Sequence, residues 1–390
     1  MSWALIPLSE EQQEIQRTAR EFARAEIAPH SVAWDRDSFF DRTVIAKMGE
    51  LGLLGMMLPE EFGGLALPTT TYLVALEEIA AADASIAVAM SVHNSLPTQM
   101  LLRWGSEAQK QRFLAPMARG EMLGAFALSE PEAGSDAASL CTQAVRDGDD
   151  WVLNGTKSWV TSGSEADVLI IMARTDTSAE RRGARGISAF IVTPDLPGFK
   201  VGKKEDKMGL RASPTVQIEL ANLRVPAGNL LGKEGAGFLM AMQSLDNGRL
   251  GIAAQAIGIA RCALEHAIHY AGERRQFGKP IKEFEAIQFK LADMATRIAA
   301  ARALLYQAAA AKDRGEQITQ YSSMSKLFAS ETAMWVTTQA IQIFGGYGYV
   351  KEYPVERLFR DAKVTEIYEG TSEIQRIVIA RELYSHSPTR

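Results

Sequence analysis

The chain has 390 residues, with 47% hydrophobic and 23% charged side chains and a formal net charge of −5. This composition is typical of a globular protein and excludes a disordered chain, and the length predicts two or three domains of roughly 150 residues. Lysine and arginine form no long basic stretch, so the sequence does not indicate a nucleic-acid-binding protein. A short basic group, Arg181, Arg182 and Arg185, is interpreted as part of an exposed loop.

The two cysteines, Cys141 and Cys262, lie far apart and form no CxxC pair, and the five histidines form no HExxH motif. These patterns indicate a reducing compartment and argue against a disulfide framework, a zinc site or a catalytic metal. The N-terminus has no basic segment, and its apolar run is too short for a signal or transit peptide. The longest apolar stretches, such as 79–90, fall short of the roughly 18 residues that a membrane span needs. We therefore expect a cytoplasmic, bacterial-type enzyme.

The first third of the sequence has helical patterns. Ser9 and Gln12 form a capping box, and apolar residues then recur at the spacing of a buried helix face until Pro29 ends the helix. Residues 51–64 contain Pro and Gly and predict a loop, beyond which helical patterns resume. The sequence therefore predicts an N-terminal α-helical domain over residues 1–120.

The middle of the sequence changes to strand patterns. The dipeptide Asn154-Gly155 lies between two short strand-like stretches, and such a dipeptide supplies the positive φ angles of a type I′ hairpin turn. Prolines punctuate the strand-like stretches that follow. We expect a compact antiparallel β domain over residues 121–228, with strands at 151–153, 156–161, 168–173, 186–192 and 216–220.

The last third is helical again, with long, alanine-rich amphipathic stretches joined by short connections. Such a pattern predicts an up-down four-helix bundle over residues 229–390. Ser372 and Gln375 form a second capping box, which marks the start of the last helix. The order of helical, strand and helical regions predicts an α+β multidomain fold and is not the βαβ alternation of a Rossmann fold. The four helices are expected at 238–272, 283–314, 321–344 and 371–383.

Two polar segments of the middle region have the composition of a ligand site. The hydroxyls of Ser129 and Ser135 lie on either side of Gly134, which allows a close backbone approach to a polar ligand. Trp159 and Thr161 stand at a predicted strand end, where an aromatic ring and a hydroxyl can contact a ring ligand. Taken alone, each segment is explained better by an ordinary loop or by a half-buried strand tryptophan.

Three further segments lie in the C-terminal region. Arg274 has the side chain best shaped for a bidentate phosphate contact, with a surface ion pair to Glu273 as the alternative. The glycines of residues 342–349 follow a helix rather than a strand, so they are not a Rossmann loop, and they indicate another ligand's backbone cradle or a helix C-cap. Glu369 precedes a predicted helix start, where a carboxylate also complements the helix dipole.

The order of these five segments is more specific than any one of them. The chain resembles the acyl-CoA dehydrogenase family along essentially its whole length. One family signature matches residues 127–139, and a second runs from Gln342 to Asp361. The run Tyr-Glu-Gly-Thr-Ser-Glu-Ile-Gln-Arg around Glu369 is highly specific to the family. The helix around residues 246–249 is most similar to the short-chain (butyryl-CoA) and short-branched-chain branch.

The resemblance implies that FAD lies between the β domain and the C-terminal bundle, with contacts partly shared across a subunit boundary. Thr161 is then expected near flavin N5. Glu285 stands where relatives often have Gln, and because a carboxylate cannot donate unless protonated, its contact with FAD stays open. The implied FAD site comprises Phe126, Leu128, Ser129, Ser135, Trp159, Thr161, Arg274, Phe277, Gln342, Gly345, Gly346, Thr371 and Glu373, and the implied substrate site comprises Ser135, Asp246, Arg249 and Gly370.

For the reaction, the resemblance implies α,β-dehydrogenation of an acyl-CoA thioester to the trans-2-enoyl-CoA. Glu369 is expected to remove the α proton while flavin N5 takes the β hydride. Exclusion of water is expected to raise the pKa of Glu369 towards working pH. Some relatives carry the base on the helix after Asp246, but that position is Gly248 in this chain, which has no side chain.

The resemblance also implies electron-transfer flavoprotein as the acceptor and a homotetramer as the assembly. The substrate is expected to be a short or short-branched acyl-CoA, with a medium-chain substrate as the alternative. An acyl-CoA oxidase, which passes electrons to oxygen, is a second enzymatic interpretation. A non-catalytic flavin- or acyl-CoA-binding protein belongs to a different class, and the acid at Glu369 argues against it.

Overall fold

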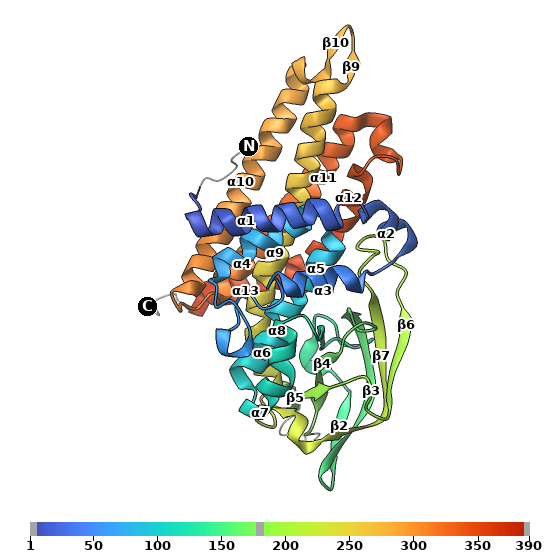
Figure 1. Cartoon of the computed structure of the whole chain (residues 1–390), viewed down its shortest axis with the longest axis vertical. Coiled ribbons are helices and arrows are strands. Elements are labelled where there is room, and N and C mark those ends of the chain that lie inside the picture. The colour runs from blue at the N-terminus through green and yellow to red at the C-terminus, as the bar shows by residue number, and fades with distance from the viewer. Residues whose placement is uncertain (1–5, 177–182, 386–390) are drawn as a thin grey trace.

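The computed structural model describes residues 6–176 and 183–385. Its helical, strand and helical regions follow one another along the chain as the sequence predicts, and the β domain lies beside the helices at one end of the long axis (Figure 1). Arg181 and Arg182, which the sequence assigns to an exposed loop, lie outside the described residues.

The first helix begins at the predicted capping box. The Ser9 hydroxyl accepts from the Gln12 backbone N–H at 3.2 Å, and the Gln12 side chain accepts from the Ser9 N–H at 3.1 Å. The helix continues as a π-helical segment, Ala23–Ile27, before the chain turns near Pro29. The helices of this region are α1 (Glu10–Phe22), α2 (Ser31–Asp37), α3 (Arg42–Glu50), α4 (Thr69–Ala82), α5 (Ala84–Ser95), α6 (Pro97–Trp104), α7 (Glu107–Gln109) and α8 (Ala115–Ala118).

The middle region forms one sheet in the order β6-β7-β3-β2-β4-β5-β8, with β1 paired to β4. The pairs are mostly antiparallel, as expected, but β1 runs parallel to β4, with Gly124 opposite Val168. β2 meets β4 only where Gln143 lies opposite Arg174, so the sheet separates into two parts there. The strands are β1 (Gly124–Ala127), β2 (Gln143–Asp147), β3 (Asp150–Thr161), β4 (Val168–Arg174), β5 (Ile187–Val192), β6 (Phe199–Lys204), β7 (Thr215–Pro226) and β8 (Leu230–Leu231).

The hairpin turn predicted at Asn154-Gly155 is wrong. β3 runs through this dipeptide without interruption, and Gly155, with a φ of 154°, lies at a register shift against β7. A Cβ at Gly155 would collide with Thr142 of the neighbouring chain segment. The glycine therefore permits a close strand approach at a bulge rather than a turn. The turn between β2 and β3 lies instead at Gly148, with a φ of 61°.

β4 is buried on both faces, which explains its continuous run of apolar residues. Val168 and Ile170 point into a core shared with α6, α8 and the start of the first C-terminal helix. Leu169 and Ile171 point the other way, into a core shared with β3 and β7. Because side chains alternate along a strand, a strand covered on both sides needs apolar residues at every position.

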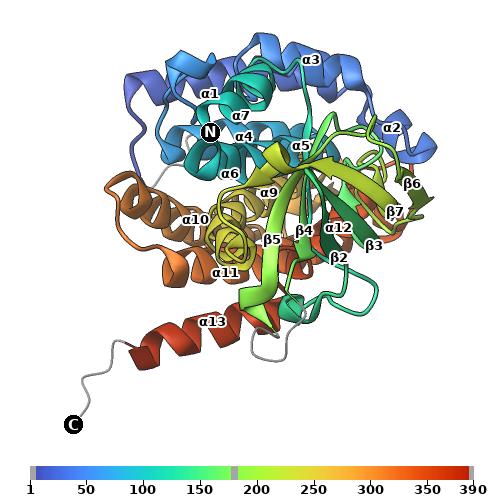
Figure 2. The same ribbon diagram turned by 90° about the horizontal axis from the view of Figure 1, so that it is seen from below.

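The C-terminal region contains the four helices that the sequence predicts. The first three pack side by side (Figure 1), whereas α13 packs on α11 and then extends away from the body (Figure 2). The bundle formed within one chain is therefore more open than the compact four-helix arrangement expected. The elements are α9 (Gly237–Glu273), β9 (Arg275–Gln276), β10 (Lys279–Pro280), α10 (Glu285–Asp313), α11 (Thr319–Phe344), α12 (Val355–Lys363) and α13 (Ser372–Ser385).

The first and last helical regions share a single hydrophobic core. Leu76 of α4, Val88 of α5 and Ile257 of α9 belong to the same buried cluster. A buried ion pair joins the same two regions, because Arg302 of α10 binds both carboxylate oxygens of Glu77 of α4, at 3.0 and 2.6 Å. α9 is thus held by packing from both regions, and α9 carries the position that faces Glu369.

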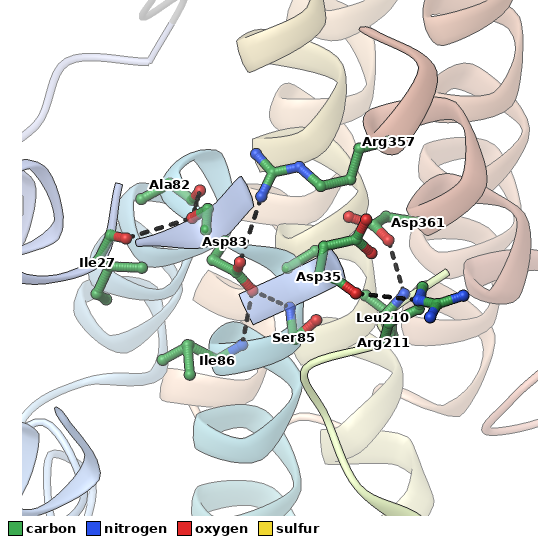
Figure 3. A network of polar contacts seen from close by, with 12 residues as sticks. Ile27, Asp35, Ala82, Asp83, Ser85, Ile86, Leu210, Arg211, Arg357 and Asp361 are labelled. Atoms are coloured by element: carbon green, nitrogen blue, oxygen red, sulfur yellow. Dashed lines mark hydrogen bonds and ion pairs between the residues drawn. The ribbon is translucent and has the colours of Figure 1, made fainter. Parts of the chain in front are cut away.

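A second polar network joins the β domain to the C-terminal helices (Figure 3). Asp361 of α12 accepts from the Leu210 backbone N–H at 2.6 Å, and Arg357, one turn earlier, lies 3.5 Å from Asp83 at the start of α5. Burial raises the pKa of Asp361 to about 7, although Arg357 opposes this shift. Arg357 and Asp361 belong to the second signature, and in the structure they connect three parts of the fold.

Candidate active site

The two polar segments of the β domain lie side by side. The Ser158 backbone N–H donates to the Ser129 carbonyl at 2.9 Å. The fully buried Lys157 donates from Nζ to the Leu128 carbonyl at 3.1 Å and to Glu130 Oε1 at 2.7 Å. The end of β1 and the end of β3 therefore form one continuous surface, as the predicted flavin contacts require.

This surface offers an aromatic ring and unpartnered hydroxyls. Trp159 is 62% exposed and has a left-handed φ of 60°, which is an uncommon conformation for a bulky residue. Within the described residues, the buried hydroxyls of Ser158 and Ser162 have no hydrogen-bond partner. Ser135 is exposed and Thr161 half-buried. An exposed strained tryptophan beside orphaned hydroxyls is the arrangement expected where a ligand completes the contacts.

Lys157 and Glu130 lie inside the two polar segments, but no motif in the sequence points to a role for either residue. The Glu130 carboxylate also accepts from the Cys141 and Thr142 backbone N–H groups, at 2.6 and 3.0 Å. Burial lowers the pKa of Lys157 to about 8, and Glu130 opposes this shift. The pair fixes the turn after β1 against β3, so it orients the residues on the surface above it.

Glu369 occupies a strained turn just before α13. Its φ is 53°, and Gly370, which follows, has a φ of 92°. The residue is partly exposed, but both carboxylate oxygens are buried and have no hydrogen-bond partner among the described residues. A Cβ on Gly248 of α9 would collide with the Glu369 carboxylate. The missing side chain at 248 therefore provides the space that the carboxylate fills.

The electrostatic surroundings of Glu369 confirm the expected pKa shift. Burial raises the pKa of Glu369 to about 7, and the positive charges of Lys326 and Arg249 partly oppose the effect. Desolvation disfavours the charged form of a carboxylate, and nearby cations favour it. At neutral pH the carboxyl group is therefore poised between its two protonation states.

The strained turn is held by two side chains from neighbouring helices. Gln375 of α13 donates from Nε2 to the Glu369 carbonyl at 3.1 Å and to the Gly370 carbonyl at 2.9 Å. Lys326 of α11 donates from Nζ to the Gly370 carbonyl at 2.8 Å. A Cβ at Gly370 would lie 2.7 Å from the Gln375 amide, so glycine is needed there for space as well as for its φ.

The capping box predicted at Ser372 and Gln375 is wrong. The helix is capped one residue earlier, because the Ile374 N–H donates to Thr371 Oγ1 at 3.3 Å. The Ser372 hydroxyl is buried without a partner among the described residues, and Gln375 reaches back to the turn. The N-cap is thus Thr371, and the helix begins at Ser372, one residue earlier than a cap at Ser372 implies.

The predicted substrate residues on α9 lie next to Gly248. Arg249 is buried, and its Nη1 donates to Asp246 Oδ1 at 2.6 Å and to Ser323 Oγ at 3.3 Å. Asp246 Oδ2 accepts from the Thr319 hydroxyl at 2.7 Å. The structure therefore gathers Asp246, Arg249 and Gly370 around Glu369, whereas Ser135 lies on the β domain.

Further polar groups, which no sequence motif marks, lie along α9 beyond Gly248. A Cβ on Gly251 would collide with the Ser91 hydroxyl and lie 3.6 Å from the Tyr72 hydroxyl, and both hydroxyls are buried. One turn further, the Gln255 side chain accepts a hydrogen bond from the Tyr368 hydroxyl and donates to the Ala84 carbonyl at 2.7 Å.

The predicted phosphate-binding residues lie elsewhere. A cavity of about 780 Å³ is lined by Arg274, Gly345, Gly346 and aromatic residues, and the Arg274 guanidinium lies 5.3 Å from the centre of the Tyr347 ring. Next to it, at the β9–β10 hairpin, Phe277 is 93% exposed with a φ of 52°. This hairpin and the β domain lie at opposite ends of the long axis (Figure 1), so one chain does not bring the two groups together.

The remaining predicted contacts lie at helix ends or at the end of β1. Glu285 is exposed at the start of α10, and Glu373 is exposed in the first turn of α13. Gln342 is exposed near the end of α11, and Phe126 and Leu128 pack at the edge of the core below the β-domain surface. Each is thus accessible to a ligand or adjoins the surface that would contact one.

The described residues contain neither a cluster of metal ligands nor a helix that could span a membrane. No group of three or more His, Cys, Asp or Glu side chains in residues 6–176 and 183–385 is placed to hold a metal ion. No helix in this part of the chain is both long and apolar enough to cross a membrane.

Comparison with known proteins supports one family along the chain. Family models described as the acyl-CoA dehydrogenase N-terminal, middle and C-terminal domains match residues 9–121, 125–223 and 235–384. The mitochondrial short-chain specific acyl-CoA dehydrogenase of Mus musculus is 50% identical over 378 residues, which are 97% of this chain and 91% of that protein.

Solved structures agree with this result. Butyryl-CoA dehydrogenase from Megasphaera elsdenii is 45% identical with a TM-score of 0.95, over 97% of this chain and 99% of that one. A chain from a structural study of the electron transferring flavoprotein of Acidaminococcus fermentans is 48% identical with a TM-score of 0.95, over 97% and 99% of the two chains. The protein therefore belongs to the acyl-CoA dehydrogenase family.

Proposed function

We propose that the protein oxidises short-chain acyl-CoA thioesters to their 2-enoyl-CoA products, with Glu369 as the base that removes the α proton. The Glu369 carboxylate carries this proposal. A carboxylate that only complements a helix dipole is normally solvated or paired, because burying an unpaired charge is costly. The Glu369 oxygens are buried and unpartnered among the described residues, which suits a group whose partner is a substrate.

Acyl-CoA dehydrogenases are FAD-dependent, and the residues present fit that cofactor. The exposed Trp159 ring provides an aromatic surface, and the orphaned Ser158 and Ser162 hydroxyls beside it provide polar partners. Trp159, Thr161 and Ser129 would hold the flavin. When bound, FAD supplies the acceptor for the hydride that leaves the β carbon.

The Arg274 cavity would hold the phosphate and adenine end of FAD from a second copy of the chain. Its lining combines an arginine with two glycines, Gly345 and Gly346, at which an added Cβ would meet nothing within 4 Å. Phe277 exposes an apolar ring that one chain leaves uncovered. Family resemblance and this exposed end together support a homotetramer in which neighbouring subunits complete each FAD site.

The chain's own residues prepare the proton transfer. A base acts best when its pKa lies near the working pH, and burial brings the pKa of Glu369 to about 7. Gly248 leaves room for the carboxylate, and Gln375 fixes the turn that carries it. The ionised carboxylate takes the α proton of the thioester, so the rate of proton removal rises with pH through about 7.

A short acyl chain is supported by the residues beyond the base. The Tyr368–Gln255 hydrogen bond joins the segment of Glu369 to α9, two turns after Gly248. We propose that these two large, hydrogen-bonded side chains limit the length of the acyl chain. The mouse and Megasphaera elsdenii relatives are a short-chain specific and a butyryl-CoA dehydrogenase, which agrees with this limit.

Electron-transfer flavoprotein is the proposed acceptor, and the cytoplasm the proposed location. The link to this acceptor is supported by the similarity to a chain from the Acidaminococcus fermentans study. The alternative acceptor, molecular oxygen, would make the protein an oxidase. Peroxide release under air distinguishes the two, and we expect little peroxide and rapid turnover with electron-transfer flavoprotein.

The central experiment mixes the purified yellow protein with acyl-CoAs of increasing chain length without oxygen. We expect butyryl-CoA to bleach the flavin faster than octanoyl-CoA or longer substrates. Glu369→Gln, with its flavin retained, is the control. A profile that peaks at long chains would refute the substrate assignment, and rapid bleaching of Glu369→Gln would refute the assignment of the base.

A further inference from the structure

Lys326 is a buried cation that the chemistry described so far does not require. It lies on α11, its side chain is fully buried, and its Nζ donates to the Gly370 carbonyl at 2.8 Å. A buried ammonium normally has an ionic partner, because removing the charge from water is costly. Within residues 6–176 and 183–385, however, no carboxylate forms an ion pair with Lys326.

The bond from Lys326 acts on the most strained turn near the base. Glu369 and Gly370 are both left-handed, with φ angles of 53° and 92°. A non-glycine residue in this region is held there by its surroundings at a cost of roughly 1–3 kcal/mol. The Gly370 carbonyl receives two donors, Lys326 Nζ and Gln375 Nε2. Together they fix the peptide that follows Glu369 and hence the direction of its side chain.

The charge of Lys326 also acts on Glu369. Of the two cations that favour the ionised Glu369 carboxylate, Lys326 has the larger effect and Arg249 the smaller. Arg249 already has an ion-pair partner in Asp246 at 2.6 Å, whereas Lys326 donates to a neutral carbonyl. Burial lowers the pKa of Lys326 to about 8, with Glu369 opposing the shift, so the ammonium is still charged at neutral pH.

The charged and titratable groups around Lys326 and Glu369 come from α9, α4 and the segment of Glu369 itself. Arg249, which Asp246 neutralises, lies on α9, and the Tyr72 hydroxyl lies on α4. The segment of Glu369 itself contributes Glu366, Tyr368 and Glu373. None of these supplies an unpaired positive charge, so Lys326 is the cation free to stabilise the carboxylate in the described chain.

We propose that Lys326 is a positioning residue for the base: its ammonium holds the Glu369–Gly370 turn in the left-handed conformation, and its charge favours the ionised carboxylate. This role rests on Glu369 being the base, as proposed above. Lys326 is proposed to contact neither substrate nor cofactor and to act only through Glu369.

The test compares the pH dependence of anaerobic flavin reduction by butyryl-CoA in four FAD-loaded proteins. For Lys326→Met we expect the midpoint of the profile to move up by about one pH unit, and the rate below the midpoint to fall about tenfold. KM should change little, because Lys326 does not contact the substrate. Gln375→Leu removes neutral donors from the same turn, so it should slow reduction without moving the midpoint.

Lys312→Met is the matched control, since Lys312 is another largely buried lysine whose pKa burial lowers to about 8, but its charged neighbour is Asp313. It should keep the wild-type midpoint. A second readout is the infrared carboxylic-acid band of Glu369, taken as the difference between each protein and its Glu369→Gln counterpart. At neutral pH the protonated fraction should rise in Lys326→Met and stay unchanged in Lys312→Met.

A wild-type midpoint in Lys326→Met would overturn the role of Lys326 and leave Glu369 as the base. Rapid reduction by Glu369→Gln would instead overturn the base itself. Should Lys326→Met fail to fold, as judged by thermal unfolding and flavin content, Lys326→Arg and Lys326→Gln give the same comparison. The arginine variant should keep the wild-type midpoint and the glutamine variant should raise it, and equal midpoints in the two would contradict a role for the charge.

Discussion

The surroundings of Glu369 and the surroundings of Arg274 differ in how much of a site one chain completes. Around Glu369, side chains from α11 and α13 bind the backbone of the turn, and the carboxylate oxygens are buried. Around Arg274, the cavity opens at the end of the molecule, beside a phenylalanine that is 93% exposed. The contrast agrees with the proposal that one subunit supplies the catalytic base and that a neighbouring subunit completes the FAD site.

The largest expected effect is on the rate of flavin reduction, which should depend on the Glu369 region and not on the Arg274 region. Glu369→Gln should lower the rate of flavin reduction by roughly 10²–10⁴-fold, the usual contribution of a general base, while FAD affinity stays at the wild-type level. Stopped-flow absorbance and an FAD titration measure the two quantities. Glu331→Gln, which removes a surface carboxylate paired with Arg376 of α13, should leave both unchanged. A large loss of FAD affinity in Glu369→Gln would contradict the proposal that the two regions serve catalysis and cofactor binding separately.

The same substitution should change stability in a pH-dependent way. The pKa of Glu369 rises from 4.5 to about 7 on folding, so its contribution to stability is present at low pH and is lost as pH rises through about 7. Glu369→Gln removes this loss and should stabilise the protein by up to about 3 kcal/mol above that pH. The difference should vanish near the unfolded pKa. Thermal unfolding across pH measures it, and a pH-independent difference would contradict the shift.

The Arg274 region should respond through cofactor affinity. Arg274→Gln should weaken FAD binding about tenfold, because a charge-assisted hydrogen bond to phosphate contributes about 1.5–3 kcal/mol. Once saturated with FAD, the variant should reduce its flavin at the wild-type rate. Arg314→Gln, at an exposed arginine paired with Glu316, is the control. Sedimentation should show whether the loss of FAD accompanies dissociation of the subunits. If Arg274→Gln reduced its flavin slowly even when saturated with FAD, the separation of catalysis from cofactor binding would be wrong.

The smallest effect concerns substrate length. Gln255→Ala removes the partner of the Tyr368 hydroxyl and shortens a side chain on α9. The ratio of kcat/KM for hexanoyl-CoA to that for butyryl-CoA should rise about fivefold, which is about 1 kcal/mol and the lower limit of what one methylene is worth in an apolar pocket. FAD affinity should not change. An unaltered ratio would show that the acyl chain ends before it reaches Gln255.

Most of the helices could be predicted because their signals are local. The Ser9 capping box and the apolar spacing behind it lie within one segment, and the observed helix follows them. The hairpin prediction failed because Asn154-Gly155 is a local signal, whereas the conformation of this dipeptide depends on a residue from another segment of the chain. Thr142 comes so close to Gly155 that the dipeptide forms a bulge inside a long strand.

The candidate site was predictable to the extent that its residues lie in compact motifs. Glu369 and Gly370 stand in a distinctive run, whereas Lys326 lies in the middle of a helix with no motif around it. Only the packing of α11 against the turn shows that its ammonium reaches the Gly370 carbonyl. The sequence does place Lys326 on a helix face of small residues, with Ser322 and Ala329 on the same face. Such a face favours burial of the lysine.

The fit between Gly248 and Glu369 has an evolutionary consequence. A Cβ at 248 would meet the end of the Glu369 side chain, so a residue other than glycine there would move the carboxylate out of its present position. An acid acquired on α9 while Glu369 remains would therefore disturb the present base as it arrives. We expect the residues at positions 248 and 369 to vary together among related sequences.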